Sequence, residues 1–231
     1  MNTIQKASAT HMNYVEKLHV FQSPYHKDVQ MNVVVSVPED FSADEKLPMM
    51  VFLHGAGERG NNPELLAIHG LLKYTRKGNF PHRAVVISPQ VPNEELTWSH
   101  LWAEAYDLIQ QMEKEYHVDE NRVTLTGISM GGFGTWEIGM MHPDHFAAIA
   151  PICGGGMSWR SGALVNTPVR AFHGDADDTV ELCMSQVMVD AINRQGGKAS
   201  LTIFHDVGHN SWAPAYEDTN LIAWLYAQKK A

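Results

Sequence analysis

Short apolar runs bounded by turn residues recur along the chain, and each is four to seven residues long. Runs of this length are typical of strands that are buried within a sheet. They predict strands at Met31–Val37, Pro48–Leu53, Ala84–Ser88, Arg122–Thr126, Phe146–Ile152, Val169–Phe172 and Ser200–Phe204.

Segments with helical periodicity separate the later strands. The clearest is Ser99–Tyr116, and we expect others directly after Ser129, across Glu181–Arg194 and across Tyr216–Gln228. Strands that alternate with helices in this way predict an α/β fold, in which a mostly parallel sheet of about eight strands carries helices on both faces.

The first part of the chain follows a different pattern. Met12–Gln22 and Met31–Val37 are joined by a short polar link that contains Pro24, which predicts an antiparallel hairpin over about residues 12–37 at one edge of the sheet. The 231 residues suffice to bury one sizeable core and are few for two. We therefore predict a single domain over residues 1–231, with its main body over about residues 47–228.

Charge and composition restrict the partners. The 17 basic and 26 acidic residues give a formal net charge of −9 without a basic cluster, so nucleic acid is not expected as a partner. No run reaches the ~18 apolar residues that crossing a bilayer needs, and the polar stretch Met1–Lys17 is unlike a signal peptide. We expect a cytoplasmic protein without membrane contact, in which Cys153 and Cys183 are free thiols.

The pentapeptide Gly127–Gly131 has the pattern G-x-S-x-G and lies between a predicted strand and a predicted helix. In this context a serine sits on a strained turn that only small neighbours permit, which makes Ser129 a candidate nucleophile. The alternative is a glycine-rich turn whose serine caps a helix. A nucleophilic serine also needs an acid and then a histidine further along the chain. Both types follow predicted strands, at Asp175, Asp177 or Asp178 and at His205 or His209, and position alone leaves that choice open.

The segment His54–Gly60 follows the strand Pro48–Leu53, where a hydrolase places a second donor for the oxyanion. It also spells G-x-G-x-x-G, but Gly78–Pro81, about twenty positions on, lacks the acid that would hold a ribose. We therefore expect no nucleotide cofactor. His142–His145 reads as a helix end at Pro143, and no metal site is expected there. Four further residues are candidates for lining a substrate pocket, the aromatic ones being equally compatible with packing: Glu58, Trp98, Trp159 and Trp212.

Five stretches together resemble the prolyl-oligopeptidase-like and dienelactone-hydrolase-like esterase group of α/β-hydrolases, at residues 53–60, 123–136, 142–146, 173–180 and 208–212. The resemblance extends from about Leu47 to Leu225. It implies the α/β-hydrolase fold, and it places the acid on Asp177 and the base on His209. It also implies that the backbone N–H groups of Ala56 and Met130 hold the oxyanion.

The resemblance predicts a serine hydrolase that cleaves carboxylic esters without a metal or organic cofactor. The interval Cys153–Thr167 is short and rich in glycine, so we expect no large cap domain and an open site for small, water-soluble esters. A peptidase of the prolyl-oligopeptidase type is the alternative within the group, although 231 residues leave no room for a propeller domain. A non-catalytic binding module on the same scaffold is the alternative outside it. The residues predict no particular oligomeric state.

Overall fold

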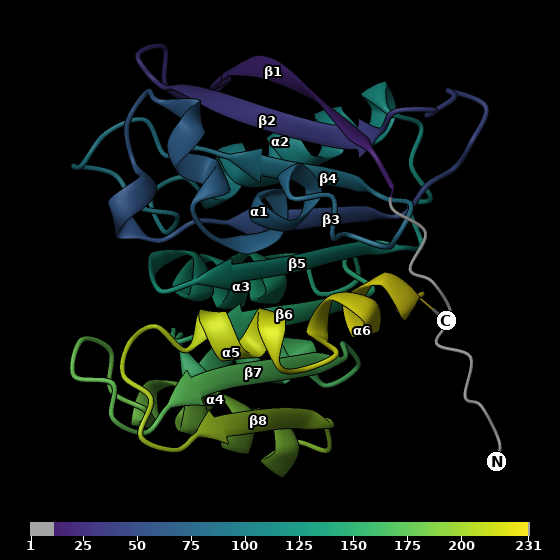
Figure 1. The fold of residues 1–231 in the computed structure, drawn as a ribbon. Coiled ribbons are helices and arrows are strands. Elements are labelled where there is room, and N and C mark those ends of the chain that lie inside the picture. Colours follow the sequence, from purple (N-terminus) through teal and green to yellow (C-terminus); the bar gives the residue numbers. More distant parts are fainter. Residues whose placement is uncertain (1–11, 231) are drawn as a thin grey trace, which may run out of the picture.

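The computed structural model describes residues 12–230, and its strands form one sheet in the order β1-β2-β4-β3-β5-β6-β7-β8 (Figure 1). The strands are β1 (Tyr14–Gln22), β2 (Gln30–Pro38), β3 (Met49–Leu53), β4 (Val85–Pro89), β5 (Val123–Ile128), β6 (Ala148–Ile152), β7 (Val169–Gly174) and β8 (Ala199–Phe204). Each of the predicted strands is present, with bounds that differ by one or two residues.

The sheet has an antiparallel edge and a parallel body. Strand β1 pairs antiparallel with β2, and β2 pairs antiparallel with β4. The remaining neighbours, from β4 through β3 to β8, all pair in parallel. The predicted edge hairpin and the predicted mostly parallel sheet are both confirmed. Residues 1–11, which belong to the predicted single domain and to the polar N-terminal stretch, lie outside the described residues.

Helices cover both faces of the sheet, as predicted (Figure 1). Helices α2 (Trp102–Glu115), α3 (Met130–Met141) and α4 (Cys183–Arg194) contribute to a core on one face. Helices α1 (Gly70–Arg76), α5 (Trp212–Glu217) and α6 (Leu221–Ala227) contribute to a second core on the other face. Three short 3-10 helices complete the list: η1 (Ala56–Glu58), η2 (Pro63–Ala67) and η3 (Ser158–Leu164).

One sequence prediction about helices needs correction. The segment Tyr216–Gln228 is not one helix, because α5 ends at Glu217 and α6 begins at Leu221. At this point the Thr219 side chain bonds to backbone groups: its Oγ1 donates to the Ala215 carbonyl at 2.6 Å and accepts the Leu221 N–H at 3.1 Å. These bonds compete with the backbone hydrogen bonds that would continue the helix. In the glycine-rich interval Cys153–Thr167, the helical segment is the short η3. In the described part of the chain, no helix has the length and apolarity needed to cross a bilayer.

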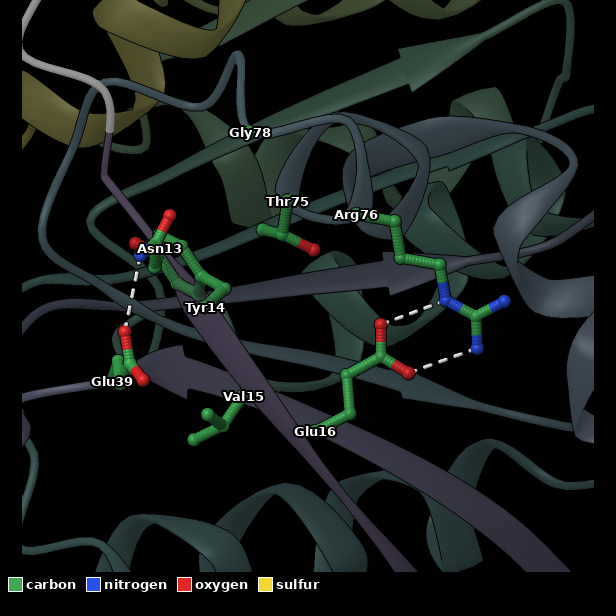
Figure 2. A pocket seen from close by; sticks show the side chains of 8 residues that line it. All are labelled: Asn13, Tyr14, Val15, Glu16, Glu39, Thr75, Arg76 and Gly78. Atoms are coloured by element: carbon green, nitrogen blue, oxygen red, sulfur yellow. Dashed lines mark hydrogen bonds and ion pairs between the residues drawn. The ribbon is translucent and has the colours of Figure 1, made fainter.

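A hollow of about 490 Å³ lies at the β1 edge of the sheet, far along the strand order from β7 and β8 (Figure 2). Its charged walls already have partners. The Arg76 guanidinium is paired with Glu16 at 2.7 Å, and Asn13 donates to Glu39 at 3.1 Å. We assign no ligand to this hollow.

Candidate active site

Four loops at the carboxyl ends of parallel strands carry the residues of the site. Ala56 follows β3, Ser129 follows β5, Asp177 follows β7 and His209 follows β8. The carboxyl ends of parallel strands lie at one edge of a sheet, which is where ligand sites of open α/β sheets are found. The topology alone therefore brings these residues to the same side of the molecule.

Ser129 sits on a sharp turn between β5 and α3, with φ 51° and ψ −118°. A non-glycine residue in this conformation is strained and must be held by its surroundings. The surroundings are backbone atoms at very close range. A Cβ added to Gly131 would collide with the Leu53 carbonyl, and one added to Gly127 would collide with the backbone of Gly131. The glycines of the G-x-S-x-G pattern are thus required by packing, as the sequence predicted.

Ser129, His209 and Asp177 form one continuous chain of hydrogen bonds. Ser129 Oγ lies 2.8 Å from His209 Nε2, and His209 Nδ1 lies 2.8 Å from Asp177 Oδ2. Because a carboxylate can only accept, Nδ1 carries a proton and Nε2 is left to accept the proton of the serine hydroxyl. This is the geometry of a nucleophile, a base and an orienting acid.

The Asp177 carboxylate is held by more than His209. Its side chain is fully buried, and its Oδ1 accepts the backbone N–H groups of Thr179 at 3.0 Å and Val180 at 2.9 Å. Burial acts to raise the pKa of Asp177, but the hydrogen bonds from His209, Val180 and Thr179 outweigh it and lower the pKa below the usual range. Asp177 is therefore a fixed carboxylate at neutral pH.

The other acids and the other histidine left open by the sequence do not reach Ser129 in this way. His205 Nδ1 lies 2.7 Å from Asp175 Oδ2, and the His205 side chain is 84% exposed. Asp178 is exposed and accepts only a weak contact from Thr179 at 3.4 Å. The structure thus brings Asp177 and His209 to the serine, in agreement with the family resemblance.

The two predicted oxyanion donors are each the first residue of a helix. Met130 begins α3, and Ala56 begins η1. The first N–H groups of a helix lack an acceptor within the helix, so they are available for an anion. The loop after β3 also lies against the nucleophile, because a Cβ added to Gly55 would lie 3.6 Å from Ser129 Cβ. The loop that carries Ala56 is thus close to Ser129, and the role of the two N–H groups as oxyanion donors stays a prediction.

His54 fixes the peptide group that carries the Ala56 N–H. Its Nε2 accepts the Val91 N–H at 3.0 Å, so its Nδ1 carries the proton and donates to the Gly55 carbonyl at 2.6 Å. Burial lowers the pKa of His54 to about 4, which keeps the ring neutral. Since the Gly55 carbonyl and the Ala56 N–H belong to one planar trans peptide, holding the carbonyl also fixes the direction of the N–H.

Trp98 does not line a pocket, and this prediction was wrong. Its side chain is fully buried in the core, where Nε1 donates to the His54 carbonyl at 2.9 Å. The indole N–H of a buried tryptophan needs an acceptor, and here the backbone at the start of the loop after β3 supplies it. Trp98 therefore helps to hold the loop after β3 in place through this hydrogen bond.

Trp212 is the aromatic candidate that lies beside the catalytic histidine. Its ring meets His209 edge to face at 5.4 Å and meets His69 at 5.2 Å. Trp212 and His69, together with Asn210, line a hollow of about 130 Å³. His69 was missed by the sequence analysis, because it lies between two short helices and follows no strand.

Glu58 and Trp159 differ in exposure. Glu58 is 7% exposed, and burial raises the pKa of its carboxyl. Its Oε1 is 3.9 Å from His69 Nε2, and its Oε2 would lie 3.2 Å from a Cβ added to Gly55, so it borders the loop beside Ser129. Trp159, on η3, is 79% exposed and packs near the Arg160 guanidinium. A role in binding substrate stays a prediction for both.

Cys153 is the third group near the pair of Asp177 and His209, with ligand atoms within 4.8 Å of one another. Burial raises the pKa of its thiol to about 12, so it remains protonated, whereas a thiol must ionise to bind a metal. Both ring nitrogens of His209 are engaged as well. His142, named in the sequence as part of a possible cluster, instead ends α3 and stacks on Tyr106 at 3.3 Å.

The parallel sheet, the strained serine turn and the two loops that supply acid and histidine define the α/β-hydrolase fold. Within that class, the chain belongs to the esterase family, because residues 26–230 match the family model described as "Putative esterase". The crystal structure of a thermostable esterase superposes with a TM-score of 0.86 at 33% identity, over 93% of this chain and 63% of that chain.

Two sequence relatives have longer chains. A bifunctional acetylxylan esterase/xylanase of Neocallimastix patriciarum is 30% identical over 135 residues, which are 52% of this chain and 20% of that protein. Dipeptidyl-peptidase 5 of Porphyromonas gingivalis is 21% identical over 224 residues, which are 76% of this chain and 32% of that protein. The chain thus spans a third or less of these two relatives.

Proposed function

We propose that this chain hydrolyses carboxylic esters of small substrates through an acyl-enzyme formed on Ser129. The observation that carries the proposal is the unbroken chain of contacts from Ser129 Oγ through His209 to Asp177, each 2.8 Å long, on a strained serine turn. Membership of the esterase family supports it independently.

In the first half of the reaction, Ser129 Oγ forms a bond to the ester carbonyl carbon while its proton passes to His209 Nε2. The carbonyl oxygen becomes an oxyanion, which the N–H groups of Ala56 and Met130 stabilise. Asp177 balances the imidazolium charge. The bond between the carbonyl carbon and the alcohol oxygen then breaks, and His209 returns the proton to the leaving alcohol.

In the second half, a water molecule takes the place of the alcohol. His209 Nε2 accepts a proton from this water as its oxygen attacks the acyl carbon. A second oxyanion forms and collapses, the bond to Ser129 Oγ breaks, and the proton returns to the serine. The products are one carboxylic acid and one alcohol, and no cofactor enters the balance.

The decisive experiment compares the parent chain with Ser129→Ala on p-nitrophenyl esters and with a fluorophosphonate probe. We expect kcat to fall on the order of 10⁴-fold or more in the variant. Labelling by the probe should be lost as well, while thermal unfolding stays similar because the serine hydroxyl contributes chemistry and no core packing. A variant that keeps a tenth of the parent activity would refute the assignment of Ser129. A parent chain that the probe does not label would favour the binding-module alternative.

Peptide bond hydrolysis is the second candidate, which the similarity to dipeptidyl-peptidase 5 favours. The same triad can attack an amide, so the two activities are separated by substrate and not by residues. We expect kcat/KM for p-nitrophenyl acetate to exceed that for a proline-containing peptide amide. The reverse order would make the chain a peptidase.

A preference for small substrates is supported by the hollow beside Trp212, the aromatic neighbour of His209, and by the chain after β6. The hollow beside Trp212 measures about 130 Å³, and the only helical segment of the interval after β6 is the short η3. Neither offers a covered tunnel for a long acyl chain, so short acyl groups should be preferred. We expect p-nitrophenyl butyrate to be hydrolysed with a higher kcat/KM than the palmitate ester. A jump in rate when palmitate forms droplets would indicate a lid, for which residues 61–79 are the candidate.

The proposal extends to the setting of the chain. The net charge of −9 supports the absence of nucleic acid partners, and the two unbridged cysteines support a cytoplasmic location. A single-domain organisation is supported by the one eight-stranded sheet. Cell fractionation with an antibody against the chain tests the location.

A further inference from the structure

His173, the last but one residue of β7, contacts the same carboxylate oxygen as His209. The His173 side chain is fully buried, and its Nε2 lies 3.3 Å from Asp177 Oδ2. The same nitrogen lies 2.9 Å from the Val180 carbonyl. Both neighbours of Nε2 are acceptors, so Nε2 must carry a proton for either contact to be favourable.

The other nitrogen of His173 contacts Ser185, near the start of α4. Nδ1 lies 2.8 Å from Ser185 Oγ, and Ser185 Oγ donates its own hydrogen to the Gly154 carbonyl at 2.8 Å. A hydroxyl has a single hydrogen to donate. Because that hydrogen is used on Gly154, Ser185 Oγ can only accept from His173, and Nδ1 must carry a proton as well.

A neutral imidazole has one N–H, whereas this environment requires two. A neutral ring would leave either the Ser185 contact or the Val180 contact without a hydrogen. In the buried interior, a polar contact without a hydrogen bond lowers the stability of the fold. We propose that His173 is held as a buried imidazolium and acts as a positioning residue, fixing the Asp177 carboxylate at Oδ2 while the backbone N–H groups of Thr179 and Val180 hold Oδ1. The proposal rests on the proposed function only in so far as Asp177 orients His209.

The contacts of His173 complete a closed ring of contacting residues around the site, which we call the circuit. Gly154 packs directly on the start of the nucleophile helix α3, since a Cβ added to Gly154 would lie 2.6 Å from the carbonyl carbon of Gly132. The circuit therefore leads from α3 through Gly154, Ser185 and His173 to Asp177, and from there through His209 back to the serine. A displacement of the acid relative to the nucleophile must disturb this circuit.

The titratable groups in contact with this network are Asp177 and His209, with the Cys153 thiol beside them. Asp177 is the carboxylate that His173 contacts, and its other charged neighbour is His209 when that ring is protonated during the reaction. The Cys153 thiol nearby stays neutral, because burial raises its pKa to about 12. The imidazolium and Asp177 thus form a buried pair, and removing one partner of such a pair is more damaging than replacing both.

The direct test is ¹⁵N NMR of the parent chain at pH 8, with His173→Gln used to identify the His173 signals. We expect both ring nitrogens of His173 to show the shifts of protonated nitrogen, coupled to the ring protons as in an imidazolium. A neutral ring at this pH would overturn the proposal. This measurement needs no substrate, so it stands even if the chain proves not to be an esterase.

Kinetics test the positioning role. His173→Gln keeps a donor near Asp177 but removes the charge, and we expect kcat to fall about 10- to 100-fold with KM within about 2-fold, as for other residues that orient a catalytic group. The acid limb of the pH–rate profile should move to higher pH by about 0.5 to 1 unit, because a cation no longer opposes protonation of His209. A merely structural role would lower the rate without moving this limb.

Ser185→Ala serves as a second variant in case His173→Gln fails to fold. It removes the acceptor for Nδ1 and leaves the contact with Asp177, so we expect a loss of kcat of about 10-fold or less, with the acid limb moved in the same direction but by less. The control is His205→Gln on the exposed histidine, which should change neither quantity. Unchanged kcat in both His173→Gln and Ser185→Ala would overturn the positioning role.

Discussion

Two aspartate–histidine pairs lie between the loop after β7 and the loop after β8, and their contact distances are nearly the same. Asp177 and His209 are 2.8 Å apart, while Asp175 and His205 are 2.7 Å apart. Only the first pair continues to the serine, since the second nitrogen of His209 reaches Ser129 Oγ, whereas the second nitrogen of His205 lies 3.3 Å from Asp206 Oδ2. The distance between an acid and a histidine therefore does not identify a catalytic pair.

Burial and additional partners distinguish the pairs. The Asp177 side chain is fully buried, whereas the His205 side chain of the other pair is 84% exposed. The hydrogen bond from His205 lowers the pKa of Asp175 as well, but that pair is open to water, where ions screen it. The lesson is that a fixed orientation comes from exclusion of water and from several bonds to one carboxylate.

The exposed pair has a structural role of its own. Asp175 also accepts the Asp206 N–H at 2.7 Å, and Asp206 is a non-glycine residue with φ 57°. The two loops are joined further by the bond from the Ala176 N–H to the Val207 carbonyl at 3.1 Å. The exposed pair thus ties the histidine loop to the acid loop, close to the point where His209 must be placed.

The largest difference between the pairs should appear when each histidine is removed. We expect His209→Ala to lower kcat on p-nitrophenyl acetate by about 10⁶-fold, as when the base of another serine hydrolase is lost, because nothing then accepts the serine proton. His205→Ala should retain activity within about 3-fold, since surface changes have small effects. Steady-state kinetics of both variants check this, and the opposite ranking would assign the base to His205.

Removing one oxygen acceptor from each aspartate should give the next largest contrast. Asp177→Asn can present an N–H to His209, which leaves the ring in the wrong tautomer, so we expect a loss of kcat of about 10⁴-fold. Asp175→Asn should cost about 10-fold or less, through a looser histidine loop. Measured kcat values for both, with fluorophosphonate labelling rates as a second readout, decide the comparison. Equal losses would leave the acid unassigned.

The serine turn could be predicted from the sequence because its cause is local. Gly127 and Gly131 flank Ser129 directly, and a strand and a helix lie on either side. The sheet could be predicted for a similar reason, since each buried strand is a short apolar run. The choice of Asp177 among three aspartates could not be made from position, because it depends on which carboxylate the folded loops bury; the resemblance to a family supplied it.

The predictions that failed depend on tertiary contacts. Trp98 follows a strand as a pocket residue would, but its indole N–H has the His54 carbonyl as its acceptor in the core. Helix α1 was not among the predicted helices, because it begins at Gly70 with φ 66° and without a side-chain cap, which leaves no start signal in the sequence. The break at Thr219 arises from hydrogen bonds of one side chain that the periodicity does not reveal. For Trp98 and Thr219, hydrogen bonds of one side chain override the local pattern.

The contribution of the buried Asp177 to the stability of the fold should be lost in acid. The pKa of Asp177 is lower in the folded chain than in the unfolded chain, so its contribution is present above the unfolded value and is lost as pH falls through the folded value. Thermal unfolding of the parent and of Asp177→Asn should therefore differ at pH 6 and converge toward about pH 3. A difference that stays constant over this range would mean that the carboxylate charge contributes nothing to folding.

The smallest effect should be that of salt on the exposed pair. Asp175 and His205 face water, so their attraction is screened once the Debye length falls to ~3 Å at 1 M salt. At low salt and pH 6, we expect Asp175→Asn to lower Tm by no more than about 2 °C, and this difference should shrink further in 1 M NaCl. The Asp177→Asn difference should persist in the same buffer, because the buried carboxylate is shielded from ions. Differential scanning calorimetry of the parent and both variants at two salt concentrations measures this. If salt removed the effect of Asp177→Asn as well, ions would screen both pairs alike, and burial would not distinguish Asp177 from Asp175.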